Sequence, residues 1–290
     1  MTRNWDDLRA VLCVARGKTL AAAAAELGVN YTTVARRIAR LERAMGARLF
    51  ERLADGYVAT ETGAAVARHA ETMEEAELAL LRQISGRDES LAGPLTITAP
   101  QLLISNALAP VIDDFCAAHP DVELDIRATN ELLDLSRRDA DLAVRISRDP
   151  GDALIGVRLT AQHTASFDSP AWAARIENDP AGRIDWLLHR SGQRLPDIAA
   201  KAYPGSRVHI LFDDMAAMIG AAKAGLGVIR APMFIGRTSP GLVQIPLLPP
   251  QPYADIWVVG HRDVWPAAKP AAFRAVLIRG FKRCAPLFTA

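Results

Sequence analysis

Hydroxyl and guanidinium side chains gather on one side of a predicted helix over residues 31–45. The opposite side carries Val34, Ile38, Leu41 and Met45 at spacings of four, three and four, as expected for a helix with one buried face. Hydroxyls and arginine forks form hydrogen bonds with phosphates, and an arginine can bind guanine through two hydrogen bonds. The alternative is a solvated cationic face without a ligand. The outward set comprises Tyr31, Thr32, Thr33, Arg36, Arg37 and Arg40.

A second group of residues follows predicted strands in the last 200 residues. Ligands of open α/β sheets bind beyond the carboxyl ends of the strands, and a helix N-terminus there favours an anion. Arg145 follows a buried strand, so it is either paired with an acid for structure or directed at a carboxylate ligand. The candidate ligand-binding set comprises Thr98, Ala99, Pro100, Gln101, Thr129, Asn130, Arg145, Ile146, Ser191 and Arg230.

Known catalytic motifs do not accompany these groups. The six histidines are dispersed without H-E-x-x-H spacing, and the G-x-S-x-G, P-loop and G-x-G-x-x-G patterns are lacking. The three cysteines are far apart and odd in number, which favours neither a disulfide framework nor a thiolate metal site. We therefore expect no catalytic residues, no cofactor and no metal. An enzyme whose site is assembled only in space is the rival interpretation.

Two shorter helices and a tight turn are predicted to position the cationic helix. Apolar residues recur at helical spacing until Gly17, which ends the first helix. Thr19 is a suitable N-cap for a helix over residues 20–27, and Gly28 can adopt the left-handed conformation that ends it. A tight helical corner followed by a cationic helix is how many proteins place side chains against DNA base edges.

A short hairpin is predicted after the cationic helix. Leu49 and Phe50 begin a core strand, Asp55-Gly56 indicates a turn, and residues 57–59 return. Such a hairpin can act as a wing that reaches the flanking DNA backbone or minor groove. Arg52 and Tyr57 are expected near its tip.

Charge divides the chain into three segments. Residues 1–60 hold ten Lys/Arg against six Asp/Glu, residues 61–90 hold three against seven, and residues 91–290 hold 21 against 20. We interpret these as a basic head, an acidic connector and a neutral body. The total of 290 residues, with 50% hydrophobic and 23% charged, is typical of a folded globular protein. Neither a transmembrane span nor a signal peptide is expected, which indicates a cytoplasmic protein.

Residues 61–90 are predicted to be a connector with a long helix that carries a heptad-like apolar seam, and Gly86 through Gly93 is predicted to end this helix as a hinge. This seam either packs on its own chain or pairs with a second copy. A two-fold dimer suits DNA, because it can read a pseudo-palindromic site. The seam comprises Val66, Ala70, Met73, Leu80 and Ile84.

The body alternates predicted strands and helices, which indicates a mostly parallel sheet with helices on both faces. The predicted strands cover residues 95–98, 122–128, 141–146, a segment entered through 225–229, and 256–259. The predicted helices cover residues 102–118, 131–138, 214–224 and 270–281.

The head resembles the N-terminal signature of LysR-type transcriptional regulators, a resemblance that covers about sixty residues. In that family an A-A-x-x-L helix precedes a V-S-R-x-I-x-x-L-E recognition helix, then G-x-x-L-F-x-R and L-T-x-x-G. The family often has Ser-Gln-Ser-Ala where this chain has Tyr31-Thr32-Thr33, and a serine at Ala35, so the operator sequence does not carry over. The matching positions are Ala23, Ala24, Leu27, Val34, Arg36, Ile38, Leu41, Glu42, Gly46, Leu49, Phe50, Arg52, Thr60 and Gly63.

The body is similar to the family's effector domain, a two-lobed α/β fold like that of periplasmic ligand-binding proteins. The stretches GPLTITAP, FCAAHPDVELDI, DADLAVRI, FDSPAWAA, AGLGVIRAPMF and ADIWVVGH carry this similarity in that order. The resemblance implies a lobe I of residues 91–161 and 267–290 and a lobe II of residues 162–266.

The resemblance also implies what the whole chain does. It implies a winged helix-turn-helix head that binds double-stranded promoter DNA, a linker helix that dimerises, and a small-molecule effector in the interlobe cleft, for which an anion is a candidate. A homodimer or homotetramer and a possible contact with RNA polymerase follow from the same family. The alternative is a winged-helix module on a solute-binding-like domain that acts without effector coupling.

Overall fold

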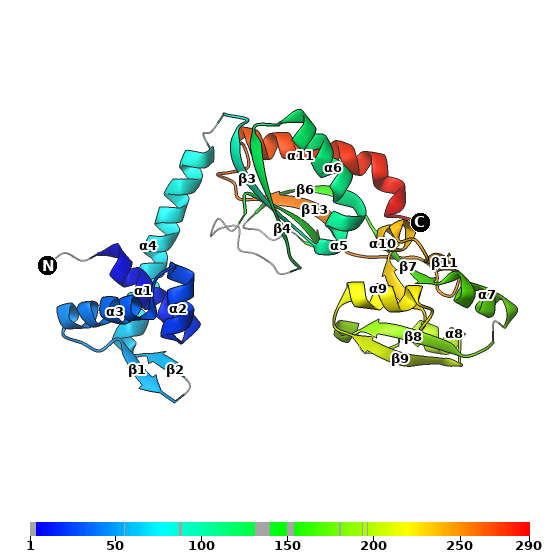
Figure 1. Cartoon of the computed structure of the whole chain (residues 1–290), viewed down its shortest axis with the longest axis horizontal. Coiled ribbons are helices and arrows are strands. Elements are labelled where there is room, and N and C mark those ends of the chain that lie inside the picture. The colour runs from blue at the N-terminus through cyan, green and yellow to red at the C-terminus, as the bar shows by residue number, and fades with distance from the viewer. Residues whose placement is uncertain are drawn as a thin grey trace. The chain divides into compact units, whose positions relative to one another are not determined.

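The computed structural model divides the chain into two compact units, a head unit (Met1–Ile84) and a body unit (Ser85–Ala290) (Figure 1). The division falls within the predicted connector. The structure describes residues 4–54, 56–86, 89–130, 140–149, 154–179, 181–192, 194–195 and 197–290.

The head unit contains three helices, a hairpin and a long fourth helix (Figure 1). Its first elements are α1 (Trp5–Gly17), α2 (Leu20–Leu27), α3 (Tyr31–Met45), β1 (Phe50–Leu53) and β2 (Gly56–Ala59). The bounds predicted for the second and third helices are confirmed. The Thr19 hydroxyl accepts a hydrogen bond from Ala22 N at 3.0 Å, and Gly28 (φ 63°) ends α2 in the left-handed conformation. Asn30 holds the N-cap position of α3 without a side-chain hydrogen bond.

The hairpin is tied to the end of α1 through Lys18. Lys18 is left-handed (φ 56°), and its carbonyl accepts a hydrogen bond from Tyr57 N at 2.8 Å. Gly56 (φ 141°) lies against the same carbonyl, since a Cβ there would stand 2.5 Å from Lys18 O. The glycine therefore permits both the turn and the close approach of the hairpin to α1.

The head has its own apolar core. Residues 10–14 of α1 pack with Val34, Ile38 and Leu41 of α3 and with Leu49 and Phe50. Three of the four residues predicted on the inward face of α3 are buried. Met45 is not: it is 38% exposed, because α3 projects beyond the core in its last turn.

The predicted connector contains the helix α4 (Glu61–Gly86), which ends at Gly86, where the predicted hinge begins. Thr60 begins it: its hydroxyl accepts from Gly63 N at 3.0 Å and donates to Arg48 O at 2.8 Å. The apolar seam is buried near the start of α4 and exposed further along the helix. Ala70 is buried in the head core and Val66 packs against it, whereas Met73, Leu80 and Ile84 are 45%, 58% and 61% exposed.

Lobe I of the body contains a five-stranded sheet in the order β4-β3-β5-β13-β6. Its strands are β3 (Gly93–Ala99), β4 (Val122–Ala128), β5 (Leu142–Ser147), β6 (Ile155–Thr160) and β13 (Asp255–Gly260). The predicted parallel arrangement holds for β4, β3 and β5, and β6 runs in the same direction, whereas β13 lies between β5 and β6 and runs antiparallel to both. The helical segments of lobe I are α5 (Gln101–Leu103), the π-helix η1 (Ile104–Leu108), α6 (Ala109–Ala118), α11 (Ala268–Cys284) and η4 (Ala285–Leu287).

Lobe II is built around β7 (His163–Asp168), which pairs antiparallel with β10, β11 and β12. A separate parallel pair joins β8 to β9. The other strands are β8 (Ile184–His189), β9 (Ser206–Phe212), β10 (Ile229–Pro232), β11 (Val243–Ile245) and β12 (Gln251–Pro252). The helical segments are α7 (Pro170–Asn178), η3 (Arg190–Gly192), α8 (Asp197–Ala202), α9 (Met215–Lys223) and α10 (Met233–Thr238).

The lobes are joined by two crossings, from β6 to β7 and from β12 to β13 (Figure 1). The predicted boundary at residue 266 is therefore wrong, because β13 already lies in the lobe I sheet. The helix predicted over residues 131–138 lies outside the described residues. Within the described parts of the chain, no helix has both the length and the apolar character needed to cross a bilayer.

Candidate nucleic-acid interface and ligand cleft

The outward residues of α3 differ in how they are held. Tyr31 is 63% exposed, Thr32 is exposed and Thr33 is half-buried in the first turn. Arg36 is exposed and forms no ion pair with any described residue. Arg37, one residue further on, donates from Nη2 to Asp6 Oδ2 at 2.9 Å. Arg36 is therefore the predicted α3 arginine whose guanidinium remains available to a ligand.

Arg40 is bound to a buried carboxylate of α1. Its Nε donates to Asp7 Oδ2 at 2.7 Å, and its Nη2 contacts Asp7 Oδ1. Asp7 is 3% exposed, and this hydrogen bonding raises the pKa of Arg40 above its ordinary value. Arg37 and Arg40 thus join α3 to α1, a role that the helical pattern of α3 alone did not indicate.

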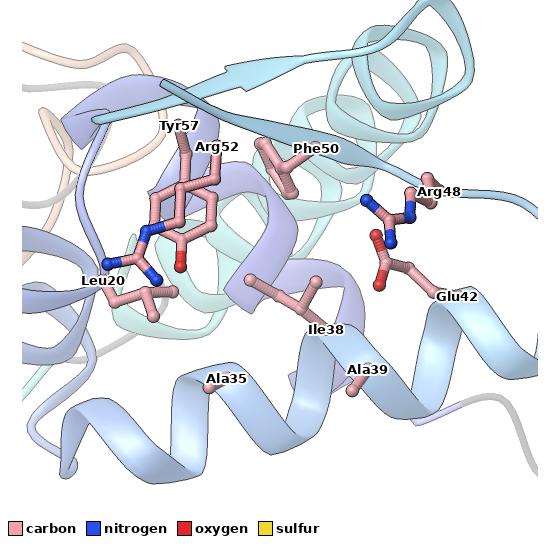
Figure 2. Close-up of a pocket in the computed structure, with 9 residues that line it drawn as sticks. All are labelled: Leu20, Ala35, Ile38, Ala39, Glu42, Arg48, Phe50, Arg52 and Tyr57. Carbon is pink, nitrogen blue, oxygen red and sulfur yellow. The ribbon is translucent and has the colours of Figure 1, made fainter. Parts of the chain in front are cut away.

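A groove lies between α3 and the hairpin, which we call the α3–wing groove (Figure 2). Ala35 and Ala39 of α3 leave room for a ligand to approach the helix closely. Figure 2 shows Arg52 and Tyr57 at one end of the groove and Arg48 at the other. The groove, of about 270 Å³, is lined by Leu20, Ala35, Ile38, Ala39, Glu42, Arg48, Phe50, Arg52 and Tyr57.

The groove has apolar walls, arginine guanidinium groups and a tyrosine hydroxyl, and such groups can bind a sugar–phosphate strand. Arg52 and Tyr57 are register partners in the hairpin, which explains why both reach the groove. Arg48 was not among the predicted residues. The sequence feature that could have indicated Arg48 is its alternation with Phe50 and Arg52, since alternate residues of an extended segment share a face. Glu42 has a structural role as well, because its Oε1 accepts from Leu49 N at 2.8 Å.

A cavity in the body, which we call the strand-end cavity, lies where β3, β4 and β5 end. It brings together six of the ten predicted ligand-binding residues and adds Val144 and Tyr253. Its volume of about 190 Å³ suits a ligand smaller than the drug-sized molecules that fill roughly 300–1,000 Å³. The predicted residues that line it are Thr98, Pro100, Thr129, Asn130, Arg145 and Ile146.

The other four predicted residues do not line this cavity. Ala99 is buried, with its carbonyl accepting from Thr129 N at 3.1 Å, and Gln101 is exposed at the start of α5. Ser191 forms a hydrogen bond with His189 Nδ1 at 2.8 Å in lobe II. Arg230 donates to Pro249 O at 2.9 Å, and burial lowers its pKa.

Tyr253 was missed because it lies two residues before β13, the strand that returns to lobe I. Its position beside Thr98 and Arg145 depends on that crossing, which local sequence did not reveal. The cavity therefore combines hydroxyl, amide and guanidinium groups from segments far apart in the chain. Such groups can bind a carboxylate or another small anion.

A winged helix-turn-helix head joined by a long helix to a two-lobed α/β body defines a class of protein: DNA-binding regulators with a ligand-binding domain. Two family models match the chain in the same order. The model described as a bacterial regulatory helix-turn-helix protein of the lysR family matches residues 5–64, and the LysR substrate binding domain matches residues 88–282. The chain belongs to the LysR family and is a transcriptional regulator of that type.

Two relatives agree with this assignment, and a solved structure agrees with the fold. A "HTH-type transcriptional regulator" of Xanthomonas campestris is 35% identical over 66% of this chain and 55% of its own length. The "Mau operon transcriptional activator" of Paracoccus denitrificans is 27% identical over 98% of this chain and 96% of its own. The full-length structure of the Vibrio cholerae virulence activator AphB has a TM-score of 0.60 at 18% identity, covering 96% of this chain and 99% of that one.

Proposed function

We propose that this regulator binds promoter DNA as a dimer through α3 and the hairpin, and that a small anion in the strand-end cavity alters this binding. The observation that carries the proposal is the α3–wing groove, with arginines at both ends and Arg36 available on the adjoining helix face. A DNA backbone strand seated there would place α3 in the major groove and the hairpin beside the minor groove. Binding to the chromosome would place the protein in the cytoplasm.

Each part of the interface has its own task. Tyr31, Thr32 and Arg36 would face base edges and adjacent phosphates, while Arg52 and Tyr57 would contact the flanking backbone. Arg37 and Arg40 would act indirectly, because their pairs with Asp6 and Asp7 hold α3 on α1. The exposed apolar end of α4 would pair with a second copy, which supplies two heads for two half-sites.

The effector part of the proposal rests on the strand-end cavity. Arg145 and the hydroxyl groups of Thr98 and Tyr253 would bind a carboxylate. The effector must bind two arrangements of the dimer unequally, because a ligand with equal affinity for both shifts nothing. A body that binds the anion without altering DNA binding would support the uncoupled alternative.

Selection from random double-stranded DNA with the full-length protein, followed by salt titration, tests the DNA part. We expect one enriched sequence with dyad symmetry and a steep salt slope. Arg36→Ala should cost about 1–3 kcal/mol and relax the preference at one base position. Arg127→Ala, which removes an equal charge from lobe I, is the control. Arg36→Ala with unchanged affinity and preference would remove Arg36 from the interface.

Thermal unfolding with a panel of small mono- and dicarboxylates tests the effector part. A ligand at a hundred times its Kd should stabilise the body by about 2.7 kcal/mol and change the affinity for the selected DNA. Arg145→Ala should abolish both effects and leave DNA binding intact. Arg158→Ala, which breaks an exposed pair with Asp255, is the control. A response that persists in Arg145→Ala would show that the cavity is wrongly assigned.

A further inference from the structure

The acidic character of α4 has a defined structural partner in the head. Ala67, Ala70, Glu74 and Glu77 are spaced by three, four and three residues, so they share one side of the helix. Ala67 and Ala70 are buried in the head core. The side of α4 that packs on the head is therefore apolar at its start and acidic further along.

Arg16, in the last turn of α1, binds this acidic continuation. Its Nη1 donates to Glu74 Oε2 at 2.8 Å and its Nη2 donates to Glu71 Oε1 at 2.9 Å. Glu26 of α2 lies 3.9 Å from the same guanidinium. The side chains of Arg16 and Glu74 are 23% and 14% exposed, so solvent only partly screens this contact. One guanidinium thus connects three helices.

A second attachment lies at the opposite end of α1. Trp5 Nε1 donates to Glu77 Oε2 at 2.9 Å, and the Trp5 ring packs against the head core. A helix held at one point can pivot about that point. Two attachments near opposite ends of α1 fix the direction in which α4 leaves the head.

Beyond these attachments three large apolar side chains of α4 are exposed. Leu80, Leu81 and Ile84 are 58%, 38% and 61% exposed. The attachments therefore lie between the recognition helix and the end of α4 that the proposed dimer would use. Any change in the angle between α1 and α4 would displace the two recognition helices relative to each other.

We propose that Arg16, assisted by Trp5, is a positioning residue that sets the spacing of the two DNA half-sites by fixing α4 to the head. This inference rests on the proposed function, a dimer that binds two half-sites. Arg16 acts through the direction of α4 and touches no DNA. Its loss should therefore alter spacing preference and leave the preference within each half-site unchanged.

The test uses the full-length protein and double-stranded DNA that carries the selected half-site twice, at every spacing across two helical turns. The wild type should bind one spacing best. Arg16→Ala should accept neighbouring spacings, with discrimination reduced about tenfold, the change expected when a partly buried charge pair is lost. Arg16→Lys should restore part of the discrimination. Affinity for a single half-site should not change.

Glu74→Gln and Glu75→Gln form a matched pair, because Glu74 binds Arg16 whereas Glu75 is exposed and makes no ion pair with a described residue. Only Glu74→Gln should broaden the spacing. If Arg16→Ala does not fold, Trp5→Phe is the deciding variant, since it removes the indole N–H donor and keeps a smaller aromatic ring at the core. Unchanged spacing preference in Glu74→Gln and in Arg16→Ala or Trp5→Phe would overturn the inference. A wild type that enriches no sequence would overturn the proposed function instead.

Discussion

Asp168, at the end of β7, is a carboxyl group with an incomplete set of partners. It is fully buried; its Oδ1 accepts from Ser169 N at 2.6 Å, and its Oδ2 has no hydrogen-bond partner among the described residues. Burial raises the pKa of Asp168 from its ordinary 3.8 to about 7. The folded protein therefore keeps a proton on Asp168 at pH values where the unfolded chain has lost it.

This difference predicts a pH-dependent stability of the body. The contribution of Asp168 to the free energy of unfolding is full below pH 3.8, falls as the pH rises, and is lost above about 7. The slope approaches about 1.4 kcal/mol per pH unit within that interval. Asp168→Asn should remove this slope of the free energy of unfolding against pH. Urea unfolding at about pH 5, 6, 7 and 8 measures the slope in steps of one pH unit. The exposed Asp113→Asn is the control, and an equal slope in both variants would contradict the prediction.

The arginines of α3 show how far residue types alone can predict a site. Their side of the helix followed from the apolar spacing, because helical periodicity is local. Which of these arginines are paired with an acid did not follow from it, because Asp6 and Asp7 reach Arg37 and Arg40 only when α1 packs across α3. Arg37 and Arg40 are paired because of residues of another helix, so the sequence of α3 alone does not distinguish Arg36 from them.

At the scale of elements, the junction between the hairpin and α4 depends on Gly63. A Cβ at this position would stand 1.9 Å from Leu49 O, inside the backbone that leads into β1. Gly63→Ala should therefore displace α4 or β1 and destabilise the head by about 1–3 kcal/mol or more. Thermal unfolding of the full chain should show the loss in the transition of the head. Thr62→Ala, an exposed neighbour, should stay within about 0.5 kcal/mol of the wild type.

Elements with local signals were predictable, and elements defined by distant partners were not. Thr19, Gly28 and Gly46 mark the ends of α2 and α3 in the sequence itself. The apolar run of β13 indicated a strand but not which sheet receives it, because its partners β5 and β6 lie about a hundred residues earlier. The same crossing brings Tyr253 to the strand-end cavity, so the error in lobe assignment and the missed cavity residue have one cause.

At the scale of the whole body unit, the segment 285–290 connects the two lobes. Phe288 is fully buried between Phe234 of α10 and Phe281 of α11, with ring centroids 5.1 and 5.4 Å away. His163, at the start of β7, donates from its backbone N to Phe288 O at 2.8 Å. The segment therefore contacts lobe I, lobe II and one of the crossings between them.

Arg237 of α10 holds this segment, and its removal provides a test. Its Nη1 donates to Thr289 O at 2.8 Å and also contacts Pro286 O. Arg237→Ala should weaken the attachment by about 1.5–3 kcal/mol, the range for hydrogen bonds from a charged group. Amide exchange at His163 and Phe288 should then accelerate, because both amides are protected by hydrogen bonds in this region.

Arg283→Ala is the matched control for Arg237→Ala. Arg283 pairs with Asp114 on the surface of lobe I, and both side chains are largely exposed, so its loss should change stability by less than about 1 kcal/mol. If segment 285–290 limits motion between the lobes, only Arg237→Ala should accelerate exchange at both crossings. Equal exchange in the two variants would show that Phe288 packing alone holds the segment. Acceleration confined to residues 285–290 would show that the segment does not restrain the lobes.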